Sequence, residues 1–247
     1  MDEEQEFMEE SPLILVVDDE EPIVDGVEAW LTMAGYAVIT ARKGSEAIEK
    51  SRQRPPAVAI IDLLLDDMPG LAVINEIHRH SPRTECIVIT GRAPERAAVA
   101  ATEVSAYGYV MKPCNADQLL LVIRRALEHG RTKEALGQSE ALAAALLEAA
   151  PGAVLVLDRK QKILSLNAAA AALLNKAANE VIDSSLADHL PGEQAEEFEQ
   201  HCRKALESGN PATLALSIGG RSLRGGIQPL KDTAGGTGRL IVAFEDV

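Results

Sequence analysis

Several side chains that can do chemistry stand at the ends of short apolar runs. Asp62 ends the run at 57–62, AVAIID, which directly follows Pro55 and Pro56. A run this short and this apolar predicts a buried strand of a parallel sheet. In open α/β sheets, ligands bind outside the carboxyl ends of the strands, so Asp62 is predicted to be displayed at such a site. The plain alternative is an aspartate that only caps the following loop.

Three other apolar runs end in side chains that would complete a site around Asp62. These are Asp18 and Asp19 after the run at 13–17, Thr90 at the end of 85–90, and Lys112 after 108–111. The groups converge on one edge if the strand order is 2-1-3-4-5. Clustered carboxylates repel and raise one another's pKa values, and Mg²⁺, which takes oxygen ligands, relieves this repulsion.

The set of residues predicts a magnesium-dependent acceptor of a phosphoryl group. A cation held by Asp19 and Asp62, with help from Asp18, leaves one oxygen of Asp62 free as a nucleophile toward phosphorus. Thr90 can donate a hydrogen bond, and Lys112 brings a positive charge for the oxygens of the transferred group.

Alternating elements would position these groups. The predicted strands lie at 13–17, 36–41, 57–62, 85–90 and 108–111, and the predicted helices at 20–34, 44–54, 71–80, 94–104 and from about 116, where Asn115 is the cap. Strands that alternate with helices through short links predict an α/β domain with a parallel sheet.

These motifs together resemble the receiver domain of two-component response regulators, over about residues 11–130. The matching residues are VVDDE at 16–20, Asp62 with Gly70 eight residues later, Thr90, and Tyr109 three residues before Lys112-Pro113. The resemblance implies a (βα)5 flavodoxin-like fold. It also implies that Asp62 accepts a phosphoryl group from a phosphohistidine on a histidine kinase or a phosphotransfer protein.

The resemblance further assigns roles to single residues. It implies that Asp18, Asp19, Asp62 and the Leu64 carbonyl form the Mg²⁺ site, that Thr90 and Tyr109 are the switch pair, and that Lys112 senses the phosphate. The sequence departs from the family's pattern at Asp66, where proline is frequent, at Pro69, where aspartate is frequent, and at Cys114, where an aromatic residue is common. None of these departures removes a required group.

The charge of a phosphoryl group suggests how such a switch would work. Phosphorylation adds roughly −1.5 to −2 charges at neutral pH. Thr90 would be drawn toward the new oxygens, and the Tyr109 ring would turn into the space that Thr90 leaves. The alternative for Tyr109 is an ordinary half-buried strand tyrosine. Tyr107 is interpreted as a packing or interface residue.

A leucine-rich connector is predicted at 131–150. Its apolar pattern continues from the helix at 118–128 through Leu136, Leu142, Leu146 and Leu147. Gly130 and Gly137 each cost about 1 kcal/mol in a helix relative to alanine. The segment is therefore predicted to be either one long helix with a weak point near Gly130 or two helices. Its leucine face could form a homodimer or pack on the next domain.

The second half of the chain, 151–247, has a different pattern. Strands are predicted at 153–158, 163–167, 212–218, 222–229 and 239–246, with helices at 168–174 and 193–207 and an irregular stretch at 180–190. This order predicts an α+β domain with an antiparallel sheet. Over about residues 140–247 the chain resembles a PAS domain, through EAAPGAVLVLD, ILSLNAAAAALL and GRLIVAFEDV. The resemblance implies a sensory or dimerising module with an apolar pocket.

The second half of the sequence has few residues that could bind a cofactor. Its aromatic residues are Phe198 and Phe244, and the Asn-Cys-Arg run of flavin-binding light sensors is absent. His201 is interpreted as a solvated helix residue and Cys202 as a packing residue. We expect no cofactor, or a small apolar PAS ligand that the sequence does not name.

Composition narrows the class of protein. The net charge of −14 argues against nucleic-acid binding, and no stretch approaches the roughly 20 apolar residues of a membrane span. Residues 1–10 hold six acids and no base, which predicts a disordered acidic tail rather than a signal peptide. The three cysteines form no CxxC pair. A cytoplasmic protein is expected.

Three hypotheses about output remain open. The first is a response regulator that is not itself an enzyme beyond accepting and slowly hydrolysing a phosphoryl group, with a protein partner contacted by the PAS half. A haloacid-dehalogenase-type phosphatase is disfavoured because Leu64 stands where a second acid is needed. The second is the front part of a hybrid histidine kinase, which the length of the reading frame would reveal. The third makes the receiver a scaffold and the PAS ligand the signal.

Overall fold

The computed structural model describes residues 11–91, 104–218, 220–232 and 236–246. The chain divides into two compact units, Met1–Gly137 and Gln138–Val247. The predicted tail at 1–10 and nearly all of the helix predicted at 94–104 lie outside the described residues.

A parallel five-stranded sheet forms the centre of the first unit. Its strands are β1 (Leu13–Val17), β2 (Ala37–Ala41), β3 (Val58–Asp62), β4 (Glu85–Thr90) and β5 (Gly108–Met111), in the order β2-β1-β3-β4-β5. Every residue of β1, β3 and β4 is buried, because helices cover both faces of the sheet. The interior residues of these strands are therefore continuously apolar rather than alternating, and the polar residues stand at the strand ends. The predicted flavodoxin-like fold and strand order are confirmed.

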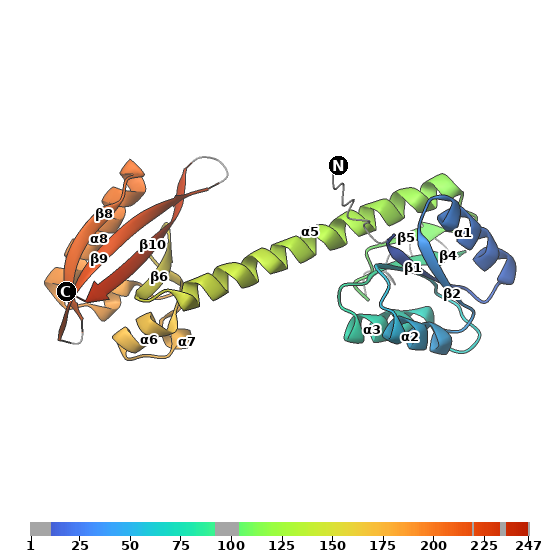
Figure 1. Ribbon diagram of the computed structural model, residues 1–247, viewed down its shortest axis with the longest axis horizontal. Helices are drawn as coiled ribbons and strands as arrows, with labels where there is room; N and C mark the ends of the chain where they lie inside the picture. The colour runs from blue at the N-terminus through green and yellow to red at the C-terminus, as the bar shows by residue number, and fades with distance from the viewer. Residues whose placement is uncertain (1–10, 92–103, 219, 233–235, 247) are drawn as a thin grey trace, which may run out of the picture. The chain divides into compact units, whose positions relative to one another are not determined.

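Among the described residues, two helices cover each face of the sheet (Figure 1). On one face α1 (Glu21–Met33) and α5 (Ala116–Ala149) pack against Ile14, Val16 and Ile60. On the other face α2 (Gly44–Gln53) and α3 (Gly70–His80) pack against alternate residues of the same strands, such as Leu15 and Ile61. This two-sided packing leaves the carboxyl edge of the sheet open for polar groups.

The connector is one continuous helix. Asn115 caps α5 by accepting a hydrogen bond from the backbone N–H of Gln118 at 2.8 Å. The helix runs through Gly130 and Gly137 to Ala149, which selects the first of the two predicted alternatives. The division between the compact units falls within α5, and the domain borders at 130 and 150 stay a prediction. Over the described residues, no helix combines the length and apolar character of a membrane span.

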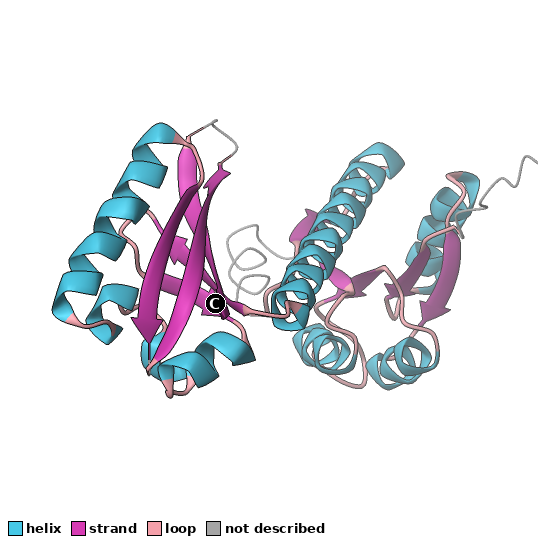
Figure 2. Ribbon diagram, turned by 60° about the vertical axis from the view of Figure 1, so that its left-hand side comes forward, coloured by secondary structure: helices cyan, strands magenta, loops and turns pink. Residues whose placement is uncertain are grey.

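The second unit is built on an antiparallel sheet in the order β7-β6-β10-β9-β8. The strands are β6 (Ala153–Asp158), β7 (Ile163–Leu166), β8 (Ala212–Ile218), β9 (Arg221–Lys231) and β10 (Thr237–Asp246). Between β7 and β8 lie α6 (Ala168–Leu174), α7 (Ala178–Val181), the 3₁₀ helix η1 (Leu186–His189) and α8 (Gly192–Ser208). Figure 2 shows these helices beside the curved sheet. The predicted α+β architecture is confirmed.

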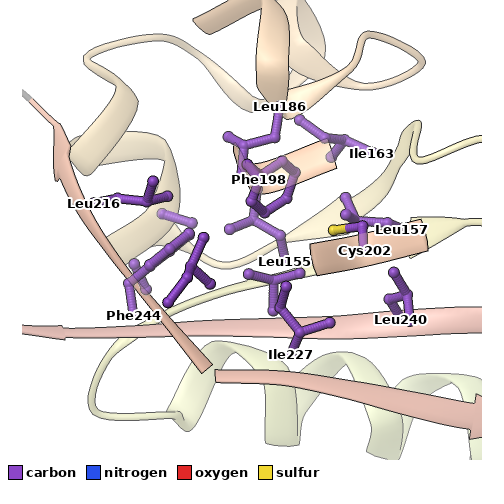
Figure 3. Close-up of a cluster of buried hydrophobic side chains, with 14 of the residues drawn as sticks. Leu155, Leu157, Ile163, Leu186, Phe198, Cys202, Leu216, Ile227, Leu240 and Phe244 are labelled. Atoms are coloured by element: carbon purple, nitrogen blue, oxygen red, sulfur yellow. The ribbon is translucent and has the colours of Figure 1, made fainter. Parts of the chain in front are cut away.

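The core of the second unit is apolar (Figure 3). Phe198 and Cys202 of α8 are fully buried and belong to one cluster with Leu155, Leu240 and Phe244 of the sheet. Burial raises the pKa of the Cys202 thiol to about 12, so the side chain behaves as a small apolar group. Cys202 is thus the packing residue that the sequence predicts.

Candidate functional site

The polar side chains at the strand ends meet at one edge of the parallel sheet. Asp62 is the last residue of β3 and Thr90 the last residue of β4, while Asp18 follows β1 and Lys112 follows β5. The register sets Asp62 beside Ile89, and Thr90 beside Met111. Each group therefore occupies the carboxyl end of one of four adjacent strands, as expected from the sequence.

Lys112 joins two carboxylates directly. Its Nζ atom lies 2.6 Å from Asp18 Oδ2 and 2.6 Å from Asp62 Oδ2. The side chains of Lys112, Asp18 and Asp62 are only 14%, 1% and 10% exposed, so solvent screens these charges weakly. Glu20 Oε1 lies farther from the ammonium, at 3.5 Å. The site is a compact, water-poor arrangement of opposite charges.

Burial disfavours the charged forms of both Asp18 and Lys112, but the neighbouring charges outweigh it only for Lys112. Burial raises the pKa of Asp18, and the close contact with the Lys112 ammonium offsets only part of this effect. For Lys112, burial favours a lower pKa, but contacts with Asp18 and Asp62 outweigh it and raise the pKa. The ammonium is consequently charged throughout the physiological range. Asp18 Oδ2 has this ion pair but no well-directed hydrogen bond.

The acidic side chains fit a divalent cation. Oxygen atoms of Asp18, Glu20 and Asp62 all lie within 4.8 Å of one another. Three carboxylates against one ammonium leave two negative charges, which is the charge that Mg²⁺ would neutralise. The buried Asp18 Oδ2, which lacks a directed hydrogen bond, is a suitable ligand atom. The donor set consists only of oxygen atoms, as a hard cation requires.

Glu20 is a member of this group that the sequence analysis missed. Asp19, which was predicted as a ligand, is half-buried and is not among the three grouped acids of the described chain. The Glu20 N–H donates to Asp18 Oδ1 at 3.1 Å across a bend at Asp19, which brings the two acids close together. The run Asp18-Asp19-Glu20 indicates a cluster of acids, but it does not tell which of them face the site. The predicted ligand set stays a prediction.

A tight loop after Asp62 explains the glycine eight residues later. The backbone N–H of Leu64 donates to Asp62 Oδ1 at 3.3 Å, and that of Gly70 donates to Leu63 O at 2.9 Å. A Cβ atom on Gly70 would lie 1.9 Å from the carbonyl oxygen of Asp62. Only glycine permits this close approach. The loop between Asp62 and Gly70 therefore closes back on the end of β3.

The predicted switch residues occupy different environments. Thr90 is buried, and its carbonyl oxygen accepts a hydrogen bond from the Lys112 backbone N–H at 2.8 Å. Tyr109 is 39% exposed on β5. The Tyr107 ring lies against His129 of α5, with 5.3 Å between ring centroids, which agrees with its interpretation as a packing residue. The switching of Thr90 and Tyr109 stays a prediction.

The histidines of the second unit have contacts within their own fold. His201 Nδ1 lies 2.9 Å from the Glu197 carbonyl oxygen of the same helix. His189 Nε2 lies 2.8 Å from Ser184 Oγ, and burial lowers the pKa of this histidine. A hollow of about 320 Å³ in this unit is lined by Pro151, Gly152, Ala153, Ala169, Leu173, Arg221, Leu223, Phe244, Glu245 and Asp246. No ligand class follows from these groups.

Comparisons with known proteins agree with this division. Residues 14–124 match the family model of the response regulator receiver domain, and residues 147–247 match that of the PAS fold. The chain therefore contains a response-regulator receiver domain followed by a PAS domain.

Similar proteins align with about half of the chain. Transcriptional regulatory protein KdpE of Mycobacterium tuberculosis is 36% identical over 126 residues, which cover 51% of this chain and 55% of KdpE. Nitrogen assimilation regulatory protein NtrX of Azorhizobium caulinodans is 36% identical over 117 residues, which cover 47% of this chain and 26% of NtrX. The crystal structure of NtrX from Brucella abortus is 34% identical, with a TM-score of 0.50, and covers 52% of this chain and 29% of that protein. The chain thus spans about half or less of the length of these relatives.

Proposed function

We propose that this chain is a response regulator whose Asp62 accepts a phosphoryl group from a histidine kinase or a phosphotransfer protein. The observation that supports this most directly is the Lys112 ammonium, held 2.6 Å from both Asp18 and Asp62 at the sheet edge. Phosphorylation of Asp62 adds negative charge to the site. The Lys112 ammonium is already in position to stabilise this charge.

The chain's own residues have separate roles in this proposal. An Asp62 oxygen attacks phosphorus while the bond between phosphorus and the donor imidazole breaks. Lys112 then pairs with the oxygens of the phosphoryl group instead of with the free carboxylate. Asp18, Asp19, Asp62 and the Leu64 carbonyl, together with Glu20, would hold Mg²⁺. When bound, Mg²⁺ neutralises charge that develops on the phosphoryl oxygens.

The donor has a place to approach beside Lys112. A hollow of about 520 Å³ adjoins the site and is lined by Glu20, Pro22, Ile23, Gly26, Val27, Trp30, Ile89, Gly91, Lys112, Pro113 and Cys114. Its walls are mainly apolar, so a side chain of a protein donor can be buried there while its phosphohistidine faces Asp62.

The output is proposed to be a protein contact. After phosphorylation Thr90 moves toward the new oxygens and the exposed Tyr109 ring turns inward, which changes the surface around β5. The PAS domain would serve sensing, dimerisation or partner binding in the cytoplasm.

The test is phosphorylation by a small phosphodonor such as acetyl phosphate in the presence of Mg²⁺. Intact mass spectrometry should show one added phosphoryl group on the wild-type chain and none on Asp62→Asn. Asp66→Asn, which changes an exposed acid in the same loop, is the matched control and should be phosphorylated. Full phosphorylation of Asp62→Asn would refute the site assignment.

Exposed leucines on α5 support the proposal of a homodimer. Leu136, Leu142 and Leu146 are 59%, 61% and 64% exposed. At about 100° per residue they fall within roughly 120° of the helix circumference, which is a stripe wide enough for a helix partner. Leu142→Glu combined with Leu146→Glu should convert a dimer into a monomer in analytical ultracentrifugation. Met33→Glu, at an 87% exposed site on α1, should not. An unchanged mass of the double variant would exclude this face.

A further inference from the structure

Helix α2 begins without a capping side chain of its own. Its N-cap residue is Lys43, whose side chain makes no capping hydrogen bond and has no acceptor to offer. The first N–H groups of a helix need acceptors from outside the helix. In α2 these groups belong to Gly44 and Ser45, and they are satisfied from another part of the chain.

Asp67 supplies the missing cap from the loop that follows the acceptor aspartate. Its Oδ1 accepts from the Gly44 N–H at 2.8 Å, and its Oδ2 accepts from the Ser45 N–H at 3.0 Å and from Ser45 Oγ at 2.8 Å. Hydrogen bonds from Ser45 and Gly44 lower the pKa of Asp67 to about 2 although the side chain is exposed. One carboxylate thus closes three hydrogen bonds over a separation of 22 to 23 residues.

A second contact fastens the same loop to the same helix end. A Cβ atom on Gly44 would lie 2.5 Å from Cγ of Met68, so the methionine side chain rests directly on the first residue of α2. The N-cap residue of α3 is Pro69, which provides no side-chain cap for that helix. The acid in this loop therefore stabilises the neighbouring helix rather than its own.

The loop is anchored at both sides of Leu64. On one side Leu64 N–H is bonded to Asp62 Oδ1, and Gly70 packs on the Asp62 carbonyl. On the other side, three residues after Leu64, Asp67 ties the loop to α2. If the hydrogen bonds of Asp67 are removed, the segment keeps the bridge between Leu64 and Pro69 and the packing of Leu65 and Met68, but it loses its polar attachment to α2 and gains conformational freedom.

We propose that Asp67 is a positioning residue of the magnesium site, because its bond to α2 holds the backbone of Leu64 in place beside Asp62. This proposal rests on the proposed function, in which the Leu64 carbonyl is a ligand. Asp67 touches neither the cation nor the phosphoryl group. Its effect reaches the site through the loop, as residues that orient ligands usually act.

Two single variants and one double variant of the full chain separate positioning from simpler effects. Asp67→Ala removes the long-range cap. Asp66→Ala removes the same charge from the adjacent position of the same loop and leaves the cap intact. Asp67→Ala combined with Lys43→Asn gives α2 an N-cap residue of its own without reconnecting the loop, since asparagine is among the best N-cap residues.

The dissociation constant for Mg²⁺, measured by titration calorimetry, and the midpoint of thermal unfolding are the two readouts. We expect Asp67→Ala to weaken Mg²⁺ binding about tenfold, as loss of a ligand-orienting partner does, and to lower the midpoint. Asp66→Ala should bind Mg²⁺ within about twofold of the wild type, since one exposed charge is largely screened. The double variant should regain the midpoint but keep the weakened Mg²⁺ affinity.

Three results would overturn the positioning role. These are unchanged Mg²⁺ affinity in Asp67→Ala, an equal loss in Asp66→Ala, and recovery of affinity together with stability in the double variant. Failure of the proposed function gives a different pattern. A wild-type chain that binds Mg²⁺ but takes no phosphoryl group would refute phosphoryl acceptance while the affinities still decide the role of Asp67. A wild-type chain that binds no Mg²⁺ would refute both.

Discussion

The buried polar groups at the receiver edge differ from a buried polar group of the second unit in how they are satisfied. In the second unit, the side chain of Asn167 is buried, and its hydrogen bonds are made to backbone groups of the same unit. Its Oδ1 accepts from the N–H groups of Val154 and Ala170, each at 3.0 Å, and its Nδ2 donates to the Gly152 carbonyl at 2.8 Å. In the first unit, buried Asp18 and Asp62 share a single ammonium and each accepts a backbone hydrogen bond at Oδ1, while Asp18 Oδ2 has no directed hydrogen bond.

This difference separates a structural polar group from a group available for chemistry. A structural group such as Asn167 has its hydrogen-bonding capacity satisfied within the fold, which stabilises the protein. The carboxylates at the receiver edge keep uncompensated negative charge, which costs stability unless a ligand supplies the missing partner. Chemistry is therefore expected in the receiver, and packing is expected to govern the PAS core.

The largest effect on stability should come from the PAS core. Phe244→Ala removes a fully packed ring from the apolar cluster and should lower the free energy of unfolding by about 3–5 kcal/mol. Urea unfolding followed by circular dichroism measures the loss. The receiver should still accept a phosphoryl group on Asp62 in native buffer. A parallel loss of phosphorylation would mean that the two units depend on each other.

Removal of Lys112 should have the next largest effect. Lys112→Ala leaves Asp18 and Asp62 buried without their cation and should cost about 3 kcal/mol at neutral pH. Because Mg²⁺ can replace the missing charge, millimolar Mg²⁺ should restore part of this stability, as thermal unfolding would show. The exposed Lys133→Ala is the control and should change neither quantity. Destabilisation that is insensitive to Mg²⁺ would contradict the charge argument.

The smallest effect concerns acid unfolding. The pKa of Asp67 is lowered from 3.8 to about 2 in the folded chain, so its contribution is complete above pH 3.8. This contribution is lost as the pH falls toward 2, because the protonated carboxyl no longer binds the N–H groups as an anion. Asp67→Asn should therefore flatten the pH dependence of stability between pH 4 and pH 2, measured by urea unfolding. Asp66→Asn, which leaves the three hydrogen bonds of Asp67 in place, is the control. The effect is small because the Asp67 side chain is exposed to solvent.

The sequence predicted those features that depend on residue type at a strand end. Asp62, Thr90 and Lys112 could be placed because apolar runs define the strands and parallel strands share a carboxyl edge. The length of α5 could not be decided, since Gly130 and Gly137 oppose a helix locally. In the structure the helix continues through both, and at Gly130 it passes the Glu85 side chain, whose Cγ is 3.4 Å from where a Cβ would stand.

Contacts between residues that are distant in the sequence could not be predicted, for a different reason. The cap from Asp67 to α2 joins residues 22 to 23 positions apart, and no spacing rule marks such a pair. Lys43 in the N-cap position was a local sign that the cap comes from elsewhere, but it did not name the partner. Glu20 belongs to the acidic group because its side chain points toward Asp18 and Asp62. The run of acids in the sequence does not determine this direction.

The most direct test of the central claim is to locate the phosphoryl group within the intact chain. The wild-type protein is phosphorylated with acetyl phosphate and Mg²⁺, the acyl phosphate is reduced with borohydride, and the peptides are mapped by mass spectrometry. We predict that the reduced residue is Asp62, converted to homoserine, with no modification in residues 138–247. Modification at another carboxylate, or none in a chain that binds Mg²⁺, would contradict the assignment of the receiver edge as the reactive site.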